Sequence, residues 1–138
     1  MQSKIDWYKQ GNTIQGEEEL FDYLKQYYYS DLKKTDKYNH TDCYTQSKVI
    51  ELKCRSTHYT KLIIEKYKYE KIIKNARIKK KIPIYINSTP CGIFEWNLNN
   101  VVVDWVEQDN LPKTTEFENN DKVCKVVGLL NVSDAYEY

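Results

Sequence analysis

The sequence predicts an α/β fold, with α+β as the alternative, built on a central mixed β-sheet flanked by helices. Three observations predict it. Helix-like and strand-like patterns follow one another in the order helix, strands, helix, strands. A basic helix separates the apolar strands at 48–54 and 82–87, and it is long enough for a parallel crossover between them. The 138 residues also match one domain with one core, so we expect a single domain over 1–138.

The first expected element is a helix from Asn12 to about Tyr28. Asn12 and Gln15 have the three-residue spacing of a capping box. The residues that recur at three- and four-residue spacing and form its buried stripe are Leu20, Phe21, Leu24, Tyr27 and Tyr28. The polar, lysine-rich stretch 30–40 follows and is expected to be a loop.

The middle of the chain predicts two strands, a helix and a third strand. The first two strands lie near Asp42–Thr45 and over Lys48–Cys54, with a Gln46-Ser47 turn between them. A connection then leads to a helix over Ile63–Lys80. The β-branched run Ile82–Asn87 reads as a buried strand with Pro83 near its beginning.

The C-terminal part predicts a hairpin and a last strand. The hairpin is expected from Cys91–Leu98 and Val101–Val106, with Asn99-Asn100 as its turn. The remaining segments are a polar excursion over Leu111–Asp121, a strand over Lys122–Leu130 and a short helix or tail over Val132–Tyr138.

Composition excludes several classes of protein. No run of about 18 apolar residues is present, so we expect no membrane span. The first residues lack the apolar core of a secretion signal, and we expect a cytoplasmic protein. The four cysteines show no zinc spacing, which favours reduced thiols.

Charge is distributed unevenly along the chain. Residues 61–81 carry nine Lys or Arg against two Glu, whereas residues 104–138 carry eight Asp or Glu against three Lys. A basic face that meets a polyanion would show this asymmetry, and so would a solvated helix flank.

The stretch from Asp42 to Arg55, DCYTQSKVIELKCR, carries the densest chemical signal. Side chains alternate between the two faces of a strand, so Glu51 and Lys53 share one face while Leu52 and its apolar neighbours share the other. Covering a carboxylate and an ammonium is costly unless something pairs with them, as a metal ion and a phosphodiester would. A plain ion pair at a sheet edge is the structural alternative.

These residues resemble the PD-(D/E)XK nuclease superfamily. The match consists of Asp42, then Glu51-Leu52-Lys53, with an early glutamate on the helix before and lysines on the helix after. The opening QGEEELFDYL is similar to the Holliday-junction-resolvase-like branch. The resemblance covers about residues 12–106 and implies a restriction-endonuclease-like core, with 107–138 as an acidic extension. No Pro precedes Asp42, which departs from the family pattern.

The resemblance implies a Mg²⁺ (or Mn²⁺) site and no organic cofactor. Asp42 and Glu51 would bind the ion with the Leu52 carbonyl, and Lys53 would orient or deprotonate the attacking water or offset phosphate charge. Glu17 is the expected second-metal or water-mediated ligand, because it continues the buried stripe of its helix. Glu18 and Glu19 are expected to face solvent and to favour the helix dipole.

Contacts with nucleic acid are expected from Lys66 or Lys68, between which helical periodicity does not decide, and from Arg55, for which a plain surface position is equally open. We therefore expect a metal-dependent DNA endonuclease acting on branched or structured DNA, and a homodimer by analogy. The alternatives are a catalytically inactive DNA-binding or inhibitory protein with the nuclease fold, and a protein-interaction domain.

Overall fold

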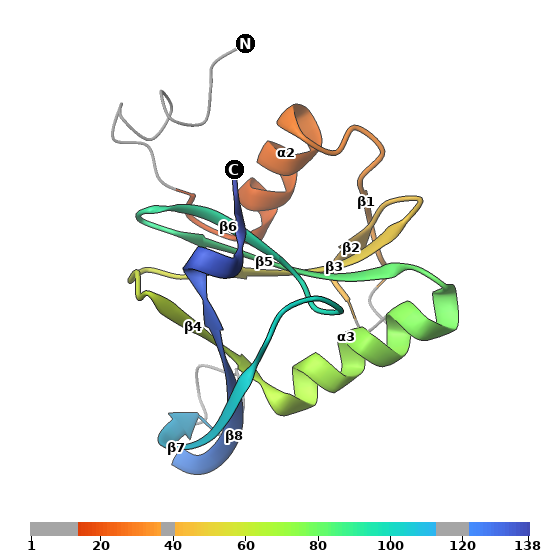
Figure 1. Cartoon of the computed structure of the whole chain (residues 1–138). Coiled ribbons are helices and arrows are strands. Elements are labelled where there is room, and N and C mark those ends of the chain that lie inside the picture. Colours follow the sequence, from red (N-terminus) through yellow and green to blue (C-terminus); the bar gives the residue numbers. More distant parts are fainter. Residues whose placement is uncertain (1–13, 37–40, 113–121) are drawn as a thin grey trace.

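The computed structural model describes residues 14–36, 41–112 and 122–138 (Figure 1). Two α-helices and nine strands are formed there. Their bounds are β1 Lys33–Lys34, β2 Cys43–Tyr44, β3 Lys48–Cys54, β4 Lys61–Glu65, β5 Ile82–Thr89, β6 Gly92–Asn97, β7 Asp104–Pro112, β8 Lys122–Asn131, β9 Tyr136–Glu137, α2 Glu17–Tyr27 and α3 Lys66–Lys79, with a 3-10 turn at Val132–Asp134.

The strands form two sheets. The larger has the order β1-β2-β3-β5-β6-β9, and the smaller has the order β4-β8-β7. Strands β3 and β5 are parallel, with Leu52 opposite Ile86, and all other pairs are antiparallel. The long α3 crossover makes this parallel pair possible. The predicted mixed sheet with flanking helices is therefore confirmed, in its α+β form.

Strand β3 divides the interior into two apolar clusters, as its alternation predicts. Ile50 and Leu52 belong to the cluster that packs against α2, whereas Val49 belongs to the cluster that packs against α3. The second cluster surrounds the fully buried Trp96, whose indole Nε1 donates to the Asn131 carbonyl at 3.0 Å. Burying the indole with its donor satisfied fixes the smaller sheet against the larger one.

The start of α2 differs from the prediction. The helix begins at Glu17 with Gly16 as its N-cap, and Asn12 lies outside the described residues. The Glu19 carboxylate accepts from the Gln15 backbone N–H at 3.2 Å, so a glutamate in the first turn reaches back in the manner of a capping box, but four residues later than expected. The helix ends at Tyr27, close to the predicted end, and Tyr23 rather than Tyr28 completes its buried stripe.

Two further boundaries are corrected. The expected loop at 30–40 contains β1, and residues 37–40 lie outside the described part. The expected helix from Ile63 begins instead at Lys66, because Lys61–Glu65 forms β4. Leu62 and Ile64 are buried by pairing with β8, a partner about 65 residues away that local periodicity does not reveal.

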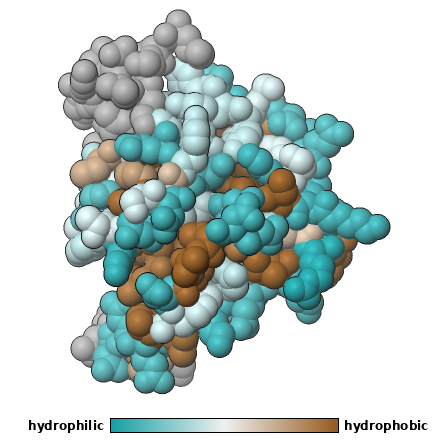
Figure 2. Space-filling view, viewed as in Figure 1, coloured by the Kyte–Doolittle hydropathy of each residue, from teal (hydrophilic) through white to brown (hydrophobic). Residues whose placement is uncertain are grey.

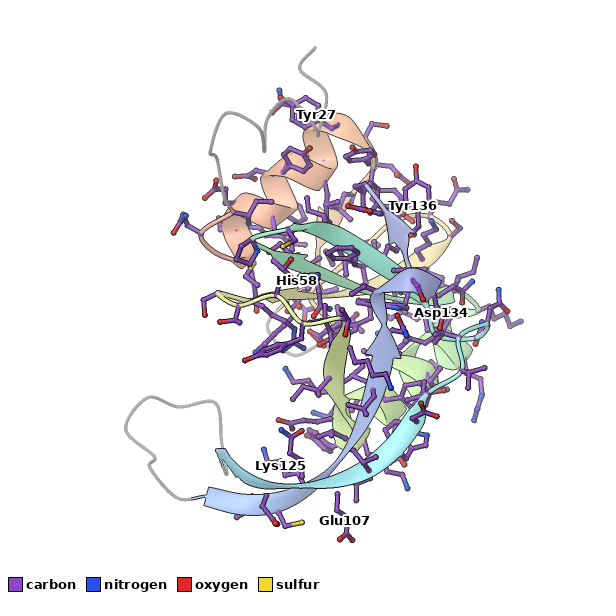
Figure 3. The ribbon with its side chains drawn as sticks, turned by 60° about the vertical axis from the view of Figure 1, so that its left-hand side comes forward. Tyr27, His58, Glu107, Lys125, Asp134 and Tyr136 are labelled. Atoms are coloured by element: carbon purple, nitrogen blue, oxygen red, sulfur yellow. The ribbon has the colours of Figure 1, made fainter. Side chains whose placement is uncertain are left out.

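The predicted hairpin between 91–98 and 101–106 is wrong. Strand β6 pairs with β5 and β9, whereas β7 pairs with β8 in the other sheet. The predicted strand over Lys122–Leu130 is confirmed as β8, but it is not the last one, because β9 follows at Tyr136–Glu137. Residues 113–121 of the expected polar excursion lie outside the described residues, and Leu111 and Pro112 end β7. Figure 3 shows β7 and β8 extending beyond the larger sheet, with Glu107 and Lys125 on this pair.

The C-terminal residues are built into the larger sheet. Tyr136 pairs with Glu95, which adds β9 to the edge of β6. The Tyr138 hydroxyl donates to the Glu95 carboxylate, and its oxygen lies 2.9 Å from the Tyr29 hydroxyl oxygen. Lys48 Nζ donates to the same Tyr29 hydroxyl at 2.9 Å, so a half-buried polar network closes this edge.

Gly128 of β8 provides a test of the smaller sheet. A Cβ atom at this position would lie 2.3 Å from Val103 Cγ1, so Gly128→Ala overpacks the contact between β8 and the segment before β7. We expect it to lower the free energy of unfolding by about 1–3 kcal/mol, and Val103→Ala in the same chain to restore most of the loss. Urea unfolding of the two single variants and the double variant measures this. Simple additivity of the two losses would contradict the β7–β8 packing described here.

Candidate active site

Asp42 lies where β2 begins, beside the middle of β3. Its backbone N–H donates to the Ile50 carbonyl at 3.1 Å, and its carboxylate Oδ2 accepts from the Leu52 N–H at 2.8 Å. β2 pairs with β3 only at Val49 and Ile50. The Asp42 side chain therefore supplies the hydrogen-bond acceptor that the β2 backbone does not offer to Leu52. Sequence spacing brought the two strands together correctly, and the pairing of Cys43 with Ile50 sets the register.

Three polar residues hold the backbone around Asp42. Thr35 donates to the Asp42 carbonyl from its backbone N–H at 3.2 Å, and its hydroxyl donates to the carbonyl of the neighbouring Thr41. Asn75 of α3 donates to the hydroxyl of the neighbouring Thr41 at 3.0 Å, and both of these side chains are buried. Sequence reasoning missed Thr41 and Asn75. A polar Asn at a core-facing position of an otherwise basic helix is the signal that could have drawn attention to it.

Glu51 is buried against Asp42. Its side chain points to the α3 face of β3, it is 9% exposed, and its carboxyl is hydrogen-bonded to that of Asp42. Burial raises the pKa of Glu51 to about 9, and the hydrogen bond and negative charge of Asp42 act in the same direction. Two carboxyl groups in this arrangement hold one proton between them unless a cation replaces it.

Lys53 lies on the same face of β3 and is half-buried. Burial lowers the pKa of its ammonium group, and the positive charges of Arg55 and Lys68 lower it further. The charge of Lys68 also acts on the carboxyls of Glu51 and Glu17. Lys68 therefore lies beside the acidic pair, whereas the Lys66 ammonium stands over the Trp105 ring, 6.0 Å from its centroid.

Glu17 approaches the acidic pair from the start of α2. It lines a pocket of about 170 Å³ together with Asp42, Leu52, Phe21, Glu18 and Lys34. Partial burial and the charge of Asp42 raise the pKa of its carboxyl. Glu18 is paired instead with Lys34. Glu17 is thus the first-turn glutamate next to Asp42, but its side chain is exposed like those of Glu18 and Glu19 and does not continue the buried stripe that helix phase predicts.

Arg55 is engaged inside the protein. Its Nε donates to Asn87 Oδ1 at 2.5 Å, and its Nη2 donates to the Ile63 carbonyl at 2.5 Å and to the Tyr85 hydroxyl at 3.3 Å. These bonds join β3 and β5 of one sheet to β4 of the other. No local sequence pattern indicates this bridging role, and a phosphate contact from Arg55 would use its remaining Nη1.

The donor set fits a hard divalent cation. Asp42 and Glu51 offer adjacent carboxylate oxygens, the ligand type that Mg²⁺ and Mn²⁺ prefer. The Ile50 carbonyl points toward Asp42, so the carbonyl of Leu52, two residues on, points to the same side of β3. Within the described ranges, no three Asp, Glu, His or Cys side chains are close enough to coordinate one ion directly. Glu17 would therefore reach an ion held by Asp42 and Glu51 through a water molecule.

Comparison with solved structures shows the same fold in a nuclease. The chain is similar to Hjc from Archaeoglobus fulgidus, described as a Holliday junction resolvase from an archaeal hyperthermophile. The TM-score is 0.54 over 84% of this chain and 85% of that chain, with 12% sequence identity. The fold that the resemblance to resolvase-like nucleases implies is therefore confirmed. No family model and no curated protein matches the sequence.

Proposed function

We propose that this chain is a divalent-cation-dependent DNA endonuclease that hydrolyses phosphodiester bonds of branched or otherwise structured DNA. The observation that carries the proposal is the hydrogen-bonded pair of Asp42 and Glu51 with Lys53 on the same strand face. A buried acidic pair is costly for folding and has a clear use in holding a cation. The shared fold with an archaeal Holliday junction resolvase supports the choice of DNA as substrate.

In this proposal Asp42, Glu51 and the Leu52 carbonyl would hold Mg²⁺ or Mn²⁺, and Glu17 would act on the ion through water. When bound, such an ion lowers the pKa of a coordinated water and neutralises charge on the phosphoryl oxygens. Hydrogen bonds from Leu52 to the Asp42 carboxylate and from Thr35 to the Asp42 carbonyl keep the first ligand in place.

Lys53 acts on the attacking water or on the phosphate. Its ammonium is half-buried near the carboxylates of Glu17 and Glu65, and its pKa is lowered by burial, so it can exchange a proton more easily than an exposed lysine. Lys68 lies next to it from α3 and is the better placed of the two helix lysines to contact a phosphate near the site. Lys66 and Arg55 would contact the backbone farther away.

Branched DNA and a dimer belong together in this proposal. One Asp42–Glu51 pair per chain cuts one strand, so cutting two strands of a junction calls for two copies related by a two-fold axis.

The described residues contain no helix with the length and apolar character of a membrane span.

The test is a cleavage assay on four substrates: a four-way junction, supercoiled plasmid, linear duplex and single strands. We expect cleavage with Mg²⁺ or Mn²⁺ and none with EDTA, fastest on the junction. Binding of DNA without cleavage of any substrate would contradict the enzyme and leave an inactive DNA-binding protein with this fold. The absence of salt-dependent DNA binding would favour a protein-interaction domain.

A further inference from the structure

The positive charge of this chain is concentrated on α3 and the two residues after it. Residues 66–81 contain eight Lys or Arg and a single acidic residue, Glu70, although the whole chain has a net charge of only +1. The exposed basic side chains of this segment are Lys66, Lys74, Arg77, Lys79 and Lys80. Figure 2 shows hydrophilic side chains projecting from the side of the molecule on which α3 lies, with apolar ones between them.

Aromatic rings hold several of these ammonium groups. Lys71 stands 4.2 Å from the centroid of the Tyr67 ring. At the other end of the helix, Lys81 and Lys79 stand over the Tyr44 ring of β2, 4.6 Å and 6.0 Å from its centroid. A cation–π contact orients an ammonium without neutralising it, so the charge stays available to a ligand.

The end of α3 turns the chain toward the β2–β3 hairpin. Lys80 has a positive φ of 56°, the left-handed conformation of a helix C-cap. Lys81 then donates from Nζ to the Thr45 carbonyl at 2.7 Å. Basic side chains therefore occur along the whole of this segment, from Lys68 at the candidate active site to Lys81 beside the Tyr44 ring at the opposite end of the helix.

Stabilisation of the helix dipole accounts for only part of this pattern. Lysines in the last turn interact favourably with the helix C-terminus, but the effect is confined to that turn. It does not explain Lys71 and Lys74 in the middle of α3.

We propose that this surface, the α3 basic surface (Lys71, Lys74, Arg77, Lys79, Lys80 and Lys81), binds the sugar–phosphate backbone of one duplex arm of the substrate as it leaves the cleavage site. The inference rests on the proposed nuclease function, and it adds the length of duplex arm that the protein would contact. Lys79 lies eleven positions after Lys68 on the helix, a rise of about 16 Å, which corresponds to about five base pairs of duplex DNA.

The experiment compares two charge-matched double variants on two substrates. Lys74→Gln/Arg77→Gln removes two charges from the middle of the surface, and Lys25→Gln/Lys61→Gln removes two exposed charges from α2 and β4. The branched substrates have hairpin-closed arms of about 4 or about 12 base pairs, shorter and longer than the span of α3. Fluorescence anisotropy in EDTA measures Kd between about 50 and 200 mM salt.

We expect Lys74→Gln/Arg77→Gln to weaken binding of the long-armed substrate about tenfold or more and to reduce its salt slope by about two. The short-armed substrate and the control variant should change less than about twofold. An equal loss on both substrates, or an equal loss in the control variant, would overturn the α3 basic surface as the arm-binding element. Failure of the wild-type chain to cleave either substrate in Mg²⁺ would instead contradict the proposed function, because binding in EDTA does not depend on cleavage.

Discussion

Replacement of Glu51 by Gln is expected to abolish cleavage and, in the same protein, to raise the free energy of unfolding. Gln has the same shape but cannot ligate a hard cation as a carboxylate does, so we expect the cleavage rate to fall by about 10³-fold or more. Stability should rise because Glu51 is buried against Asp42, and a neutral amide removes the need to keep a proton on a buried acid.

The gain in stability should depend on pH in a defined direction. The pKa of Glu51 is raised to about 9 in the folded state from its ordinary value of 4.5, so the folded state retains a proton that the unfolded chain releases. The wild type therefore loses stability as pH rises from about 4.5 toward 9, and Glu51→Gln does not. We expect little difference between the two proteins near pH 5 and roughly 1–3 kcal/mol near pH 8.

Urea unfolding of both proteins at several pH values, in EDTA, measures this difference. Glu107→Gln removes an exposed carboxylate from β7 and serves as the control, for which we expect no pH-dependent change. Adding Mg²⁺ should stabilise the wild type and leave Glu51→Gln unaffected, because only the wild type keeps both carboxylate ligands. An activity loss accompanied by lower stability at pH 8 would contradict the buried acidic pair.

The parts of the fold that the sequence predicts correctly are those in which local patterns and tertiary environment agree. Strand β3 alternates between two buried faces, so its bounds at Lys48–Cys54 follow from the residues alone. The crossover from β3 through a long helix to β5 follows from element order and from the rule that such connections suit parallel strands.

The smaller sheet was missed because its pairings are distant in sequence. Residues 61–65 adjoin a helix and share its apolar spacing, so the sequence predicts that they belong to its first turn. They form a strand because they pair with β8. Val101–Val106 reads as the return strand of a hairpin with β6. From Asp104 onward this segment pairs with β8 instead. The ring centroid of Trp105 there lies 5.0 Å from that of Tyr69 of α3. Local turn residues carry no information about that contact.

The candidate site divides in the same way. Asp42, Glu51 and Lys53 were placed together by strand alternation and the hairpin, and Glu17 by helix phase, although its side chain is exposed. Helical periodicity does not show which of Lys66 and Lys68 is closer to the acidic pair. The packing of α3 does, because the Lys66 ammonium lies over the Trp105 ring whereas the charge of Lys68 acts on Glu51. A side chain's neighbours across an interface follow from tertiary packing, which a single sequence pattern does not contain.

Lys53→Met is expected to lower the cleavage rate by about 10²–10⁴-fold while DNA binding changes only slightly. The Lys53 ammonium is half-buried next to Glu17 and between the positive charges of Arg55 and Lys68. Burial has already lowered its pKa, so folding gains little from this charge, and methionine can keep the packing of its stem. We therefore expect Lys53→Met to unfold at a urea concentration no lower than that of the wild type.

Two companion variants give the result its meaning. Lys61→Met removes an exposed lysine from β4 and should leave cleavage unchanged. Lys53→Arg keeps the positive charge but cannot give up a proton near neutral pH, so retained cleavage identifies charge stabilisation, and lost cleavage identifies proton transfer. Measuring binding by anisotropy and cleavage by single turnover separates the chemical step from affinity. If Lys53→Met cleaved as fast as Lys61→Met, the Glu51-Leu52-Lys53 strand would be structural, and its charges would form no more than an ion pair at the edge of the sheet.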